Sequence, residues 1–214
     1  MAVLNRIAYY QNRRDEAPNQ ELARDLAERE DRLGIQEIAE NLWNPKDEVQ
    51  SDCLKVLYEI GYLKPELVFD YMGDFLKLLK SRNNRLEWGA MIALSTIASK
   101  CAEMLYPQVD EIQRALETGS VITRDNGVKV LAAIAAHNDE YRQRILPYLL
   151  HHLQTCRPKD VPQHAEIILP AVDASNSEDF IRILEQRMED LSGAQATRVK
   201  KAIKVANNLD GYVP

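Results

Sequence analysis

The residues best suited to binding a metal lie close together in one segment of the chain. His151, His152 and His164 fall near Cys156, and His152 and Cys156 are four positions apart. On a helix, that spacing lets an imidazole and a thiolate share one ion. Cys156 is expected just past the end of its helix, however, and no carboxylate completes the set. The pattern therefore favours solvated histidines at a helix end, and we expect no metal site.

Motifs for other chemistry are absent from the sequence. The 8 glycines include no G-x-G-x-x-G or P-loop spacing, so the common nucleotide-binding loops are not expected. The chain also contains no H-E-x-x-H, G-x-S-x-G or protein-kinase motif. Pairs of carboxylates are frequent, as in any acidic helical protein, but none stands out as a general acid and base. We expect no catalytic residues and no cofactor.

The 3 cysteines are widely spaced, and none is in a C-x-x-C arrangement. An odd number of dispersed cysteines indicates neither a disulfide framework nor a zinc knuckle. Cys53 and Cys101 fall on apolar helix faces, where free cysteine packs as a small hydrophobic residue. We expect both in the core and Cys156 near a loop. Trp43, at the end of a helix, is expected in the core or at a cap.

The chain is acidic, and its charge is unevenly distributed. The 214 residues carry a net charge of −6, whereas nucleic-acid binders usually have a basic excess. Residues 1–70 hold 9 basic and 15 acidic side chains, and residues 71–214 hold 18 of each. The longest apolar run is Val130–Ala136, and a membrane-spanning helix needs about 20 residues. Because polar residues also interrupt the N-terminus early, we expect a cytoplasmic protein that does not bind a membrane and for which nucleic acid is the less favoured partner.

A stripe of apolar residues recurs along the chain. Its first copy is Val49, Cys53, Val56, Leu57 and Ile60, the i, i+4, i+7, i+8, i+11 pattern of an amphipathic helix. The fourth member of successive copies falls at residues 57, 94, 131, 169 and 203, and the last copy is the weakest. These steps are typical of a helical repeat.

Further amphipathic segments lie between the stripes, at residues 35–42, 66–80, 108–118, 139–154 and 178–190. Each repeat is therefore two antiparallel helices, and one such pair cannot bury its apolar face alone. We expect an all-α fold, a right-handed α-solenoid of about five antiparallel helix pairs. A column of small residues should let adjacent helices approach closely: Cys53, Ala90, Gly127 and Ala165.

Two segments carry a family resemblance. Ile145–Leu150, which contains Pro147, resembles the proline-kinked first helix of a HEAT repeat, and Asn44–Val49 with the helix after it resembles the loop and second helix. The resemblance covers residues 33–207, although the family's regular arginine ladder is absent. It implies a superhelical scaffold whose inner face binds a partner, usually a protein.

The two ends of the chain lie outside this repeat array. Residues 208–214 are expected to form a C-terminal tail, and residues 1–32 an N-terminal segment with a capping helix. Glu21–Arg32 is dense in charge, with Leu22 and Leu26 as apolar anchors, which suits a cap with a polar outer face. A solvated cap is expected here rather than an acidic docking site. Residues 3–10 could form a short helix that folds onto the cap or stays mobile.

The candidate binding surface is the face of the second helices opposite the apolar stripe. Trp88 and Ile92 lie one turn apart on this face. An exposed tryptophan beside an exposed isoleucine would be an interaction site, because tryptophan is frequent in binding hot spots. The residues expected to flank this patch are Lys55, Tyr58, Asp125 and Lys129. In the alternative interpretation, Trp88 packs against a neighbouring repeat.

Three classes of function remain open. We favour a non-catalytic scaffold that mediates protein–protein interaction through its concave face. The alternative is a nucleic-acid-binding or base-repair protein, since HEAT-like alkylpurine DNA glycosylases are similar in size and architecture. Trp88, Arg124 and Asp125 fit that family's concave face only loosely, because Ile92 stands where it has an acid and a basic track is missing. An enzyme in the groove would need a pocket with coupled titratable groups.

Overall fold

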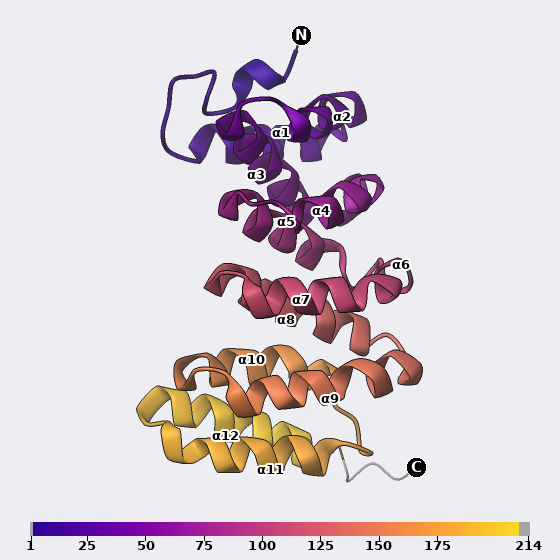
Figure 1. Ribbon diagram of the computed structural model, residues 1–214, viewed down its shortest axis with the longest axis vertical. Coiled ribbons are helices and arrows are strands. Elements are labelled where there is room, and N and C mark those ends of the chain that lie inside the picture. Colours follow the sequence, from indigo (N-terminus) through magenta and orange to yellow (C-terminus); the bar gives the residue numbers. More distant parts are fainter. Residues whose placement is uncertain (1, 210–214) are drawn as a thin grey trace. The chain divides into compact units, whose positions relative to one another are not determined.

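The computed structural model describes residues 2–209, and it contains helices and no strand within that range (Figure 1). Of the expected C-terminal tail, residues 210–214 lie outside the described part of the chain. The α-helices are α1 (Ala17–Arg29), α2 (Arg32–Glu40), α3 (Asp47–Leu63), α4 (Met72–Leu78), α5 (Asn84–Ile97), α6 (Ala102–Leu105), α7 (Val109–Thr118), α8 (Val121–Ala135), α9 (Asp139–Thr155), α10 (Val161–Ile168), α11 (Ser177–Arg187) and α12 (Gly193–Asn207).

Short 3-10 helices extend or connect these elements. They are η1 (Leu4–Arg6), η2 (Asn41–Trp43), η3 (Pro65–Leu67), η4 (Phe69–Tyr71), η5 (Tyr106–Gln108), η6 (Pro158–Asp160), η7 (Leu169–Ala171) and η8 (Met188–Asp190). Several of them stand where the sequence predicted one continuous helix. The helix expected over 66–80 is divided into η3, η4 and α4, and the helix that starts at Val161 changes to η7 after Ile168. Pro170 accounts for the second break, because proline lacks the N–H that continues an α-helix.

The chain forms two compact units. The first holds the described residues up to Cys101 together with Glu111–Gly127, and the second holds Ala102–Asp110 together with the described residues from Val128 onward. Both units consist of the helix pairs that the apolar stripes predict, so the all-α solenoid expected from the sequence is confirmed.

In the first unit, α3 packs against α1, α2 and α5 (Figure 1). The predicted stripe on α3, from Val49 to Ile60, is fully buried at every member. The small residues of the predicted column are buried as well, and a Cβ on Gly127 would come within 3.0 Å of Leu116 on α7. Close helix contacts at these positions explain why the sequence keeps small side chains there.

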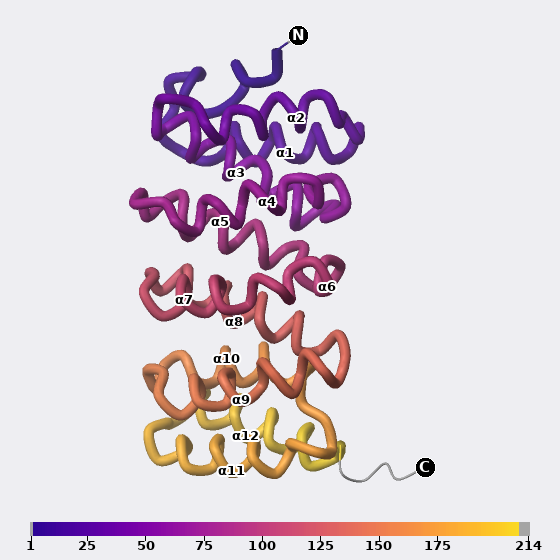
Figure 2. The backbone as a smooth tube through the Cα atoms, turned by 45° about the vertical axis from the view of Figure 1, so that its right-hand side comes forward, coloured from indigo at the N-terminus to yellow at the C-terminus, as the bar shows by residue number. Residues whose placement is uncertain are grey.

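In the second unit, α9 packs on α10 and α11, and α12 packs on α10 and α11 (Figure 2). Asn138 caps α9 by accepting a hydrogen bond from the Tyr141 backbone N–H at 2.9 Å. Pro147 lies inside α9, as the resemblance to a HEAT first helix implies. Ile145, Leu149 and Leu153 are buried on the face that α9 turns toward its neighbours.

The N-terminal segment is folded onto α1 and α2. Leu22 and Leu26 anchor α1 in the core, as expected for the capping helix, although this helix begins at Ala17 rather than at Glu21. The backbone N–H groups of Val3 and Leu4 donate to the Glu37 carboxylate, both at 3.0 Å. The segment therefore packs on the cap.

Two expectations about the core have opposite outcomes. Cys53 and Cys101 are buried, as predicted, and both are free thiols. Trp43 was expected in the core or at a cap; it is 51% exposed and so lies outside the core, at a helix end, with the Lys77 ammonium 5.8 Å from its ring centroid. Trp43 ends η2, where the chain turns outward into Asn44 and Pro45.

Among the described residues, no helix is long and apolar enough to cross a membrane.

Candidate functional site

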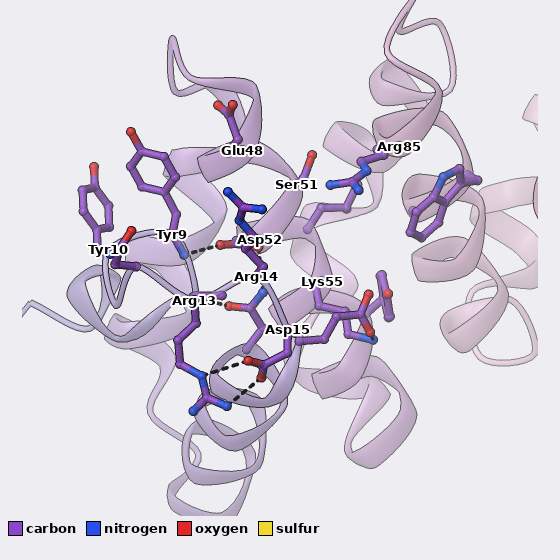
Figure 3. A pocket seen from close by; sticks show the side chains of 18 residues that line it. Tyr9, Tyr10, Arg13, Arg14, Asp15, Glu48, Ser51, Asp52, Lys55 and Arg85 are labelled. Atoms are coloured by element: carbon purple, nitrogen blue, oxygen red, sulfur yellow. Dashed lines mark hydrogen bonds and ion pairs between the residues drawn. The ribbon is translucent and has the colours of Figure 1, made fainter.

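The first unit contains a pocket of about 730 Å³ between the N-terminal segment, α3 and α5 (Figure 3). We call it the N-terminal groove. Its lining comes from residues 8–16, Asn19 of α1, the outer turns of α3 from Glu48 to Tyr58, and the first turn of α5 from Arg85 to Gly89. Lys55, Tyr58 and Trp88, three residues of the predicted binding face, are among these lining residues.

The N-terminal segment forms one wall of the groove because Asp52 of α3 holds it in place. The Asp52 carboxylate accepts hydrogen bonds from the Tyr9 backbone N–H at 2.7 Å and from the Asn19 side-chain amide at 2.8 Å (Figure 3). The Asn19 carbonyl in turn accepts from the Ala8 backbone N–H at 2.8 Å. Asn19 is buried, so every group of this small network is satisfied inside the protein.

Lys55 lies deep in the groove and is neutralised by acidic neighbours. Its ammonium is 2.8 Å from Glu16 of the N-terminal segment and 2.7 Å from Glu59 of α3, and its side chain is only 11% exposed. Burial by itself would lower the pKa of Lys55, but hydrogen bonds to Glu16, Glu59 and Tyr58 raise that pKa above its ordinary value. Lys55 therefore links the N-terminal segment to α3 and presents no unpaired charge to a ligand.

The predicted aromatic patch is smaller than the sequence suggested. Trp88 is half-buried and lines the groove, so part of its ring is accessible. Ile92 was expected on the exposed face but is buried, with 9% exposure, and Tyr58 is 5% exposed. The reason is that α5 packs against both α3 and α4, so every residue from Gly89 to Leu94 is buried.

Asp125 and Lys129 do not line the groove. They lie one turn apart on α8, and both are half-buried. Each has an interaction within the protein. Their expected role at the edge of the binding face remains a prediction.

Two arginines at the groove were missed by sequence reasoning. Arg14 extends from the N-terminal segment and Arg85 from α5, over the part of α3 that carries Ser51 (Figure 3). Both are exposed, and in the described part of the chain neither guanidinium forms an ion pair or hydrogen bond. Arg85 lies three positions before Trp88 and so shares its helix face. Extending the predicted face by one turn would have found it, whereas nothing in the repeat pattern indicates Arg14.

The second unit brings together the histidines and the cysteine that the sequence had separated. His152, Cys156 and His164 place their potential ligand atoms within 4.8 Å of one another. The expectation of solvated histidines holds for His151, which is exposed, but His164 is completely buried. The packing of α10 on α9 places His164 against His152.

Stacked helix pairs of this length form a HEAT/armadillo-like helical repeat fold, and solved structures of this fold resemble the chain. An engineered protein of known crystal structure, 18% identical, has a TM-score of 0.69 with the alignment covering 97% of this chain and 98% of that one. A designed armadillo repeat protein in complex with the peptide (KR)4 is 17% identical, with a TM-score of 0.65 over 89% and 86%. A computationally designed armadillo repeat protein for modular peptide recognition is 19% identical, with a TM-score of 0.64 over 91% and 94%.

Sequence comparison finds a partial relative of unknown role and no family. No protein-family model matches the chain. An uncharacterized protein of Methanocaldococcus jannaschii is 24% identical over 102 residues, which cover 45% of this chain. The aligned part is 49% of that protein, so the match spans about half the length of the relative. The fold therefore rests on the likeness to the solved structures.

Proposed function

We propose that this chain is a non-catalytic repeat scaffold that binds an extended segment of another protein in the N-terminal groove. The observation that carries the proposal is the pocket of about 730 Å³ over consecutive second helices, bordered by a half-buried tryptophan and two unpaired arginines. Peptide binding named in the titles of two designed proteins of similar fold is consistent with it. Neighbouring second helices present such a continuous surface in α-solenoids.

The chemistry of the groove favours a ligand with acidic and apolar side chains. The guanidinium groups of Arg14 and Arg85 are available, whereas Arg13 is paired with Asp15 at 2.8 Å and Lys55 is paired twice. A guanidinium group can bind a carboxylate through two parallel hydrogen bonds. Trp88 and the 43% exposed Tyr10 offer aromatic surface for an apolar side chain. The proposed ligand is therefore a peptide segment that places one or two carboxylates on these arginines and at least one apolar residue on the aromatic surface.

The groove gives less support to nucleic-acid binding. Its lining holds basic and acidic residues in equal number: Arg13, Arg14, Lys55 and Arg85 against Asp15, Glu16, Glu48 and Asp52. A surface that follows a phosphate backbone needs several uncompensated cations. Nucleic-acid binding thus remains the second hypothesis, and a titration with duplex DNA at low and moderate salt tests it.

Selection of random linear peptides displayed on phage tests the peptide hypothesis directly. We expect enriched sequences that contain Asp or Glu together with an apolar residue. Synthetic versions should bind the wild-type chain in fluorescence anisotropy. The double variant Arg85→Gln/Trp88→Ala should weaken their binding at least about tenfold, because buried aromatic and arginine anchors supply most of the binding energy at such sites.

Arg82→Gln provides the matched control. Arg82 is an exposed arginine in the loop before α5, and it does not line the groove. Its substitution should leave peptide affinity unchanged. If no sequence is enriched, or if the enriched peptides bind the double variant as tightly as the wild type, the proposed groove is wrong.

A further inference from the structure

Three side chains that can ligate a metal meet where α9 ends and α10 begins. His152 belongs to the last turns of α9, Cys156 is the C-cap of that helix, and His164 lies in the first turn and a half of α10. Nε2 of His152 and Nδ1 of His164 are joined by a hydrogen bond of 3.0 Å, and each imidazole has a ring nitrogen within 4.8 Å of the Cys156 sulfur. His164 is fully buried and the other two are half-buried, so the cluster has access to solvent on one side.

These separations are close to those around a tetrahedral ion. Zinc binds imidazole nitrogen at about 2.0–2.1 Å and thiolate sulfur at about 2.3 Å, which places tetrahedral ligand atoms roughly 3.3–3.6 Å apart. The two imidazole nitrogens, at 3.0 Å, already lie within a few tenths of an ångström of that spacing. The sulfur needs to move by at most little more than about 1 Å, which rotation about χ1 can supply at the loss of its weak hydrogen bond to the Leu153 carbonyl.

We propose that His152, Cys156 and His164 bind one zinc ion and thereby clamp α10 onto the end of α9. Two neutral imidazoles and one thiolate are a ligand set that zinc prefers. Binding forms the Zn–S bond at the expense of the S–H bond, and the thiol proton passes to solvent. The hydrogen bond between Nε2 of His152 and Nδ1 of His164 is given up, and the imidazole that donates it takes its proton on the other ring nitrogen, so that both nitrogens present a lone pair to the ion. Three protein ligands leave the fourth tetrahedral position to a water molecule or to a ligand from solution.

The end of α9 is held in place independently of the proposed ion. Arg187 of α11 donates hydrogen bonds to the backbone carbonyls of Leu153, Gln154 and Cys156, at 2.7 to 2.9 Å. The turn that follows is braced by Arg157 and Asp160, 2.7 Å apart. Because these contacts already order the segment, little conformational entropy remains to be lost when an ion binds.

The charges around the cluster also tolerate a cation. Zinc with one thiolate carries a net single positive charge. Arg187 adds a positive charge near Cys156, and the Asp160 carboxylate adds a negative one. Arg187 is itself paired with Asp190 at 2.8 Å, so the guanidinium is compensated before an ion enters.

The test uses the full chain, free of any affinity tag and stripped with a chelator. Titration with zinc chloride in a calorimeter should saturate at one ion per chain, and magnesium chloride should give no binding. Cobalt chloride should produce a thiolate-to-cobalt charge-transfer band in the near ultraviolet. Cys156→Ser should abolish this band, and both Cys156→Ser and His152→Gln should weaken zinc binding at least about tenfold. Both substituted positions are half-buried, and both variants leave the fully buried His164 unchanged.

His151→Gln is the matched control, because His151 is the exposed neighbour of His152 and is not part of the cluster. It should bind zinc and cobalt like the wild type. Circular dichroism verifies that each variant remains helical. The site is disproved if zinc does not saturate at one equivalent, if Cys156→Ser binds zinc as tightly as the wild type, or if His151→Gln loses binding equally.

Discussion

At the scale of single residues, the Asp52 carboxylate holds the N-terminal segment against α3 as one wall of the N-terminal groove. Asp52 accepts hydrogen bonds from the Tyr9 backbone N–H and the Asn19 side-chain amide, and the Asn19 side-chain carbonyl accepts one from the Ala8 backbone N–H. Without these bonds the N-terminal segment would be joined to α3 by the hydrogen bond from the Lys46 ammonium to the Tyr9 hydroxyl, at 3.0 Å, and by the Lys55–Glu16 ion pair. Since Glu16 is 60% exposed, that pair is worth at most about 1 kcal/mol after solvent screening.

We therefore expect Asp52→Ala to loosen the N-terminal segment. Hydrogen bonds to a charged group contribute about 1.5–3 kcal/mol, so amide exchange at Ala8 and Tyr9 should accelerate roughly tenfold or more. Exchange in α12, which belongs to the other unit, should stay the same. Glu48→Ala is the control, since Glu48 is an exposed acid on the preceding turn of α3. Unchanged exchange at Tyr9 in Asp52→Ala would contradict this account of the wall.

At the residue scale, the predicted helix faces brought side chains to one groove, while their role in binding stays a prediction. The periodicity of α3 and α5 placed Lys55, Tyr58 and Trp88 on one surface, and all three line the groove. Their accessibility was harder to predict. Ile92 and Tyr58 are buried because neighbouring helices cover more of each second helix than one apolar stripe indicates.

At the scale of elements, glycines control how closely α3 and α5 approach. A Cβ on Gly61 of α3 would collide with the side chain of Thr96 on α5, including its Cβ at 2.9 Å. By contrast, a Cβ on Gly73 of α4 would meet nothing within 4 Å. The same substitution should therefore have opposite effects at these two helical positions.

We expect Gly61→Ala to lower the free energy of unfolding by about 1–3 kcal/mol, as overpacking usually does. Gly73→Ala should raise it by up to about 1 kcal/mol, because alanine has the better helix propensity. Urea denaturation followed by circular dichroism compares the two variants. If Gly61→Ala is as stable as the wild type, the account of a close contact between Gly61 of α3 and Thr96 of α5 is wrong.

At the scale of the whole molecule, charge disfavours polyanionic partners. The chain carries a net charge of −6, and residues 1–70, which contribute the larger part of the N-terminal groove, contain the acidic excess. Binding to duplex DNA depends on replacing counterions with several protein cations. The available cations in the groove are two arginines, and acidic residues lie beside them.

A titration with duplex DNA at low and at moderate salt should accordingly show no salt-sensitive binding. Fluorescence anisotropy of a labelled duplex provides the measurement. An affinity that falls steeply and log-linearly with salt would instead favour the nucleic-acid hypothesis. A matched titration with single-stranded DNA checks whether the exposed aromatic rings bind bases by stacking.

The amino-acid sequence determined the repeat by itself, because an amphipathic helix is encoded by residues only three to four positions apart. Val49–Ile60 and its copies therefore predicted the helix pairs and the all-α solenoid. Contacts between residues far apart in sequence were decided only by packing. Arg14 lies over α3 because Asp52 holds the segment before it, and His164 meets His152 because α10 folds back on α9. Both candidate sites consist of such contacts, which depend on the path of a turn and the fit of two helices rather than on local periodicity.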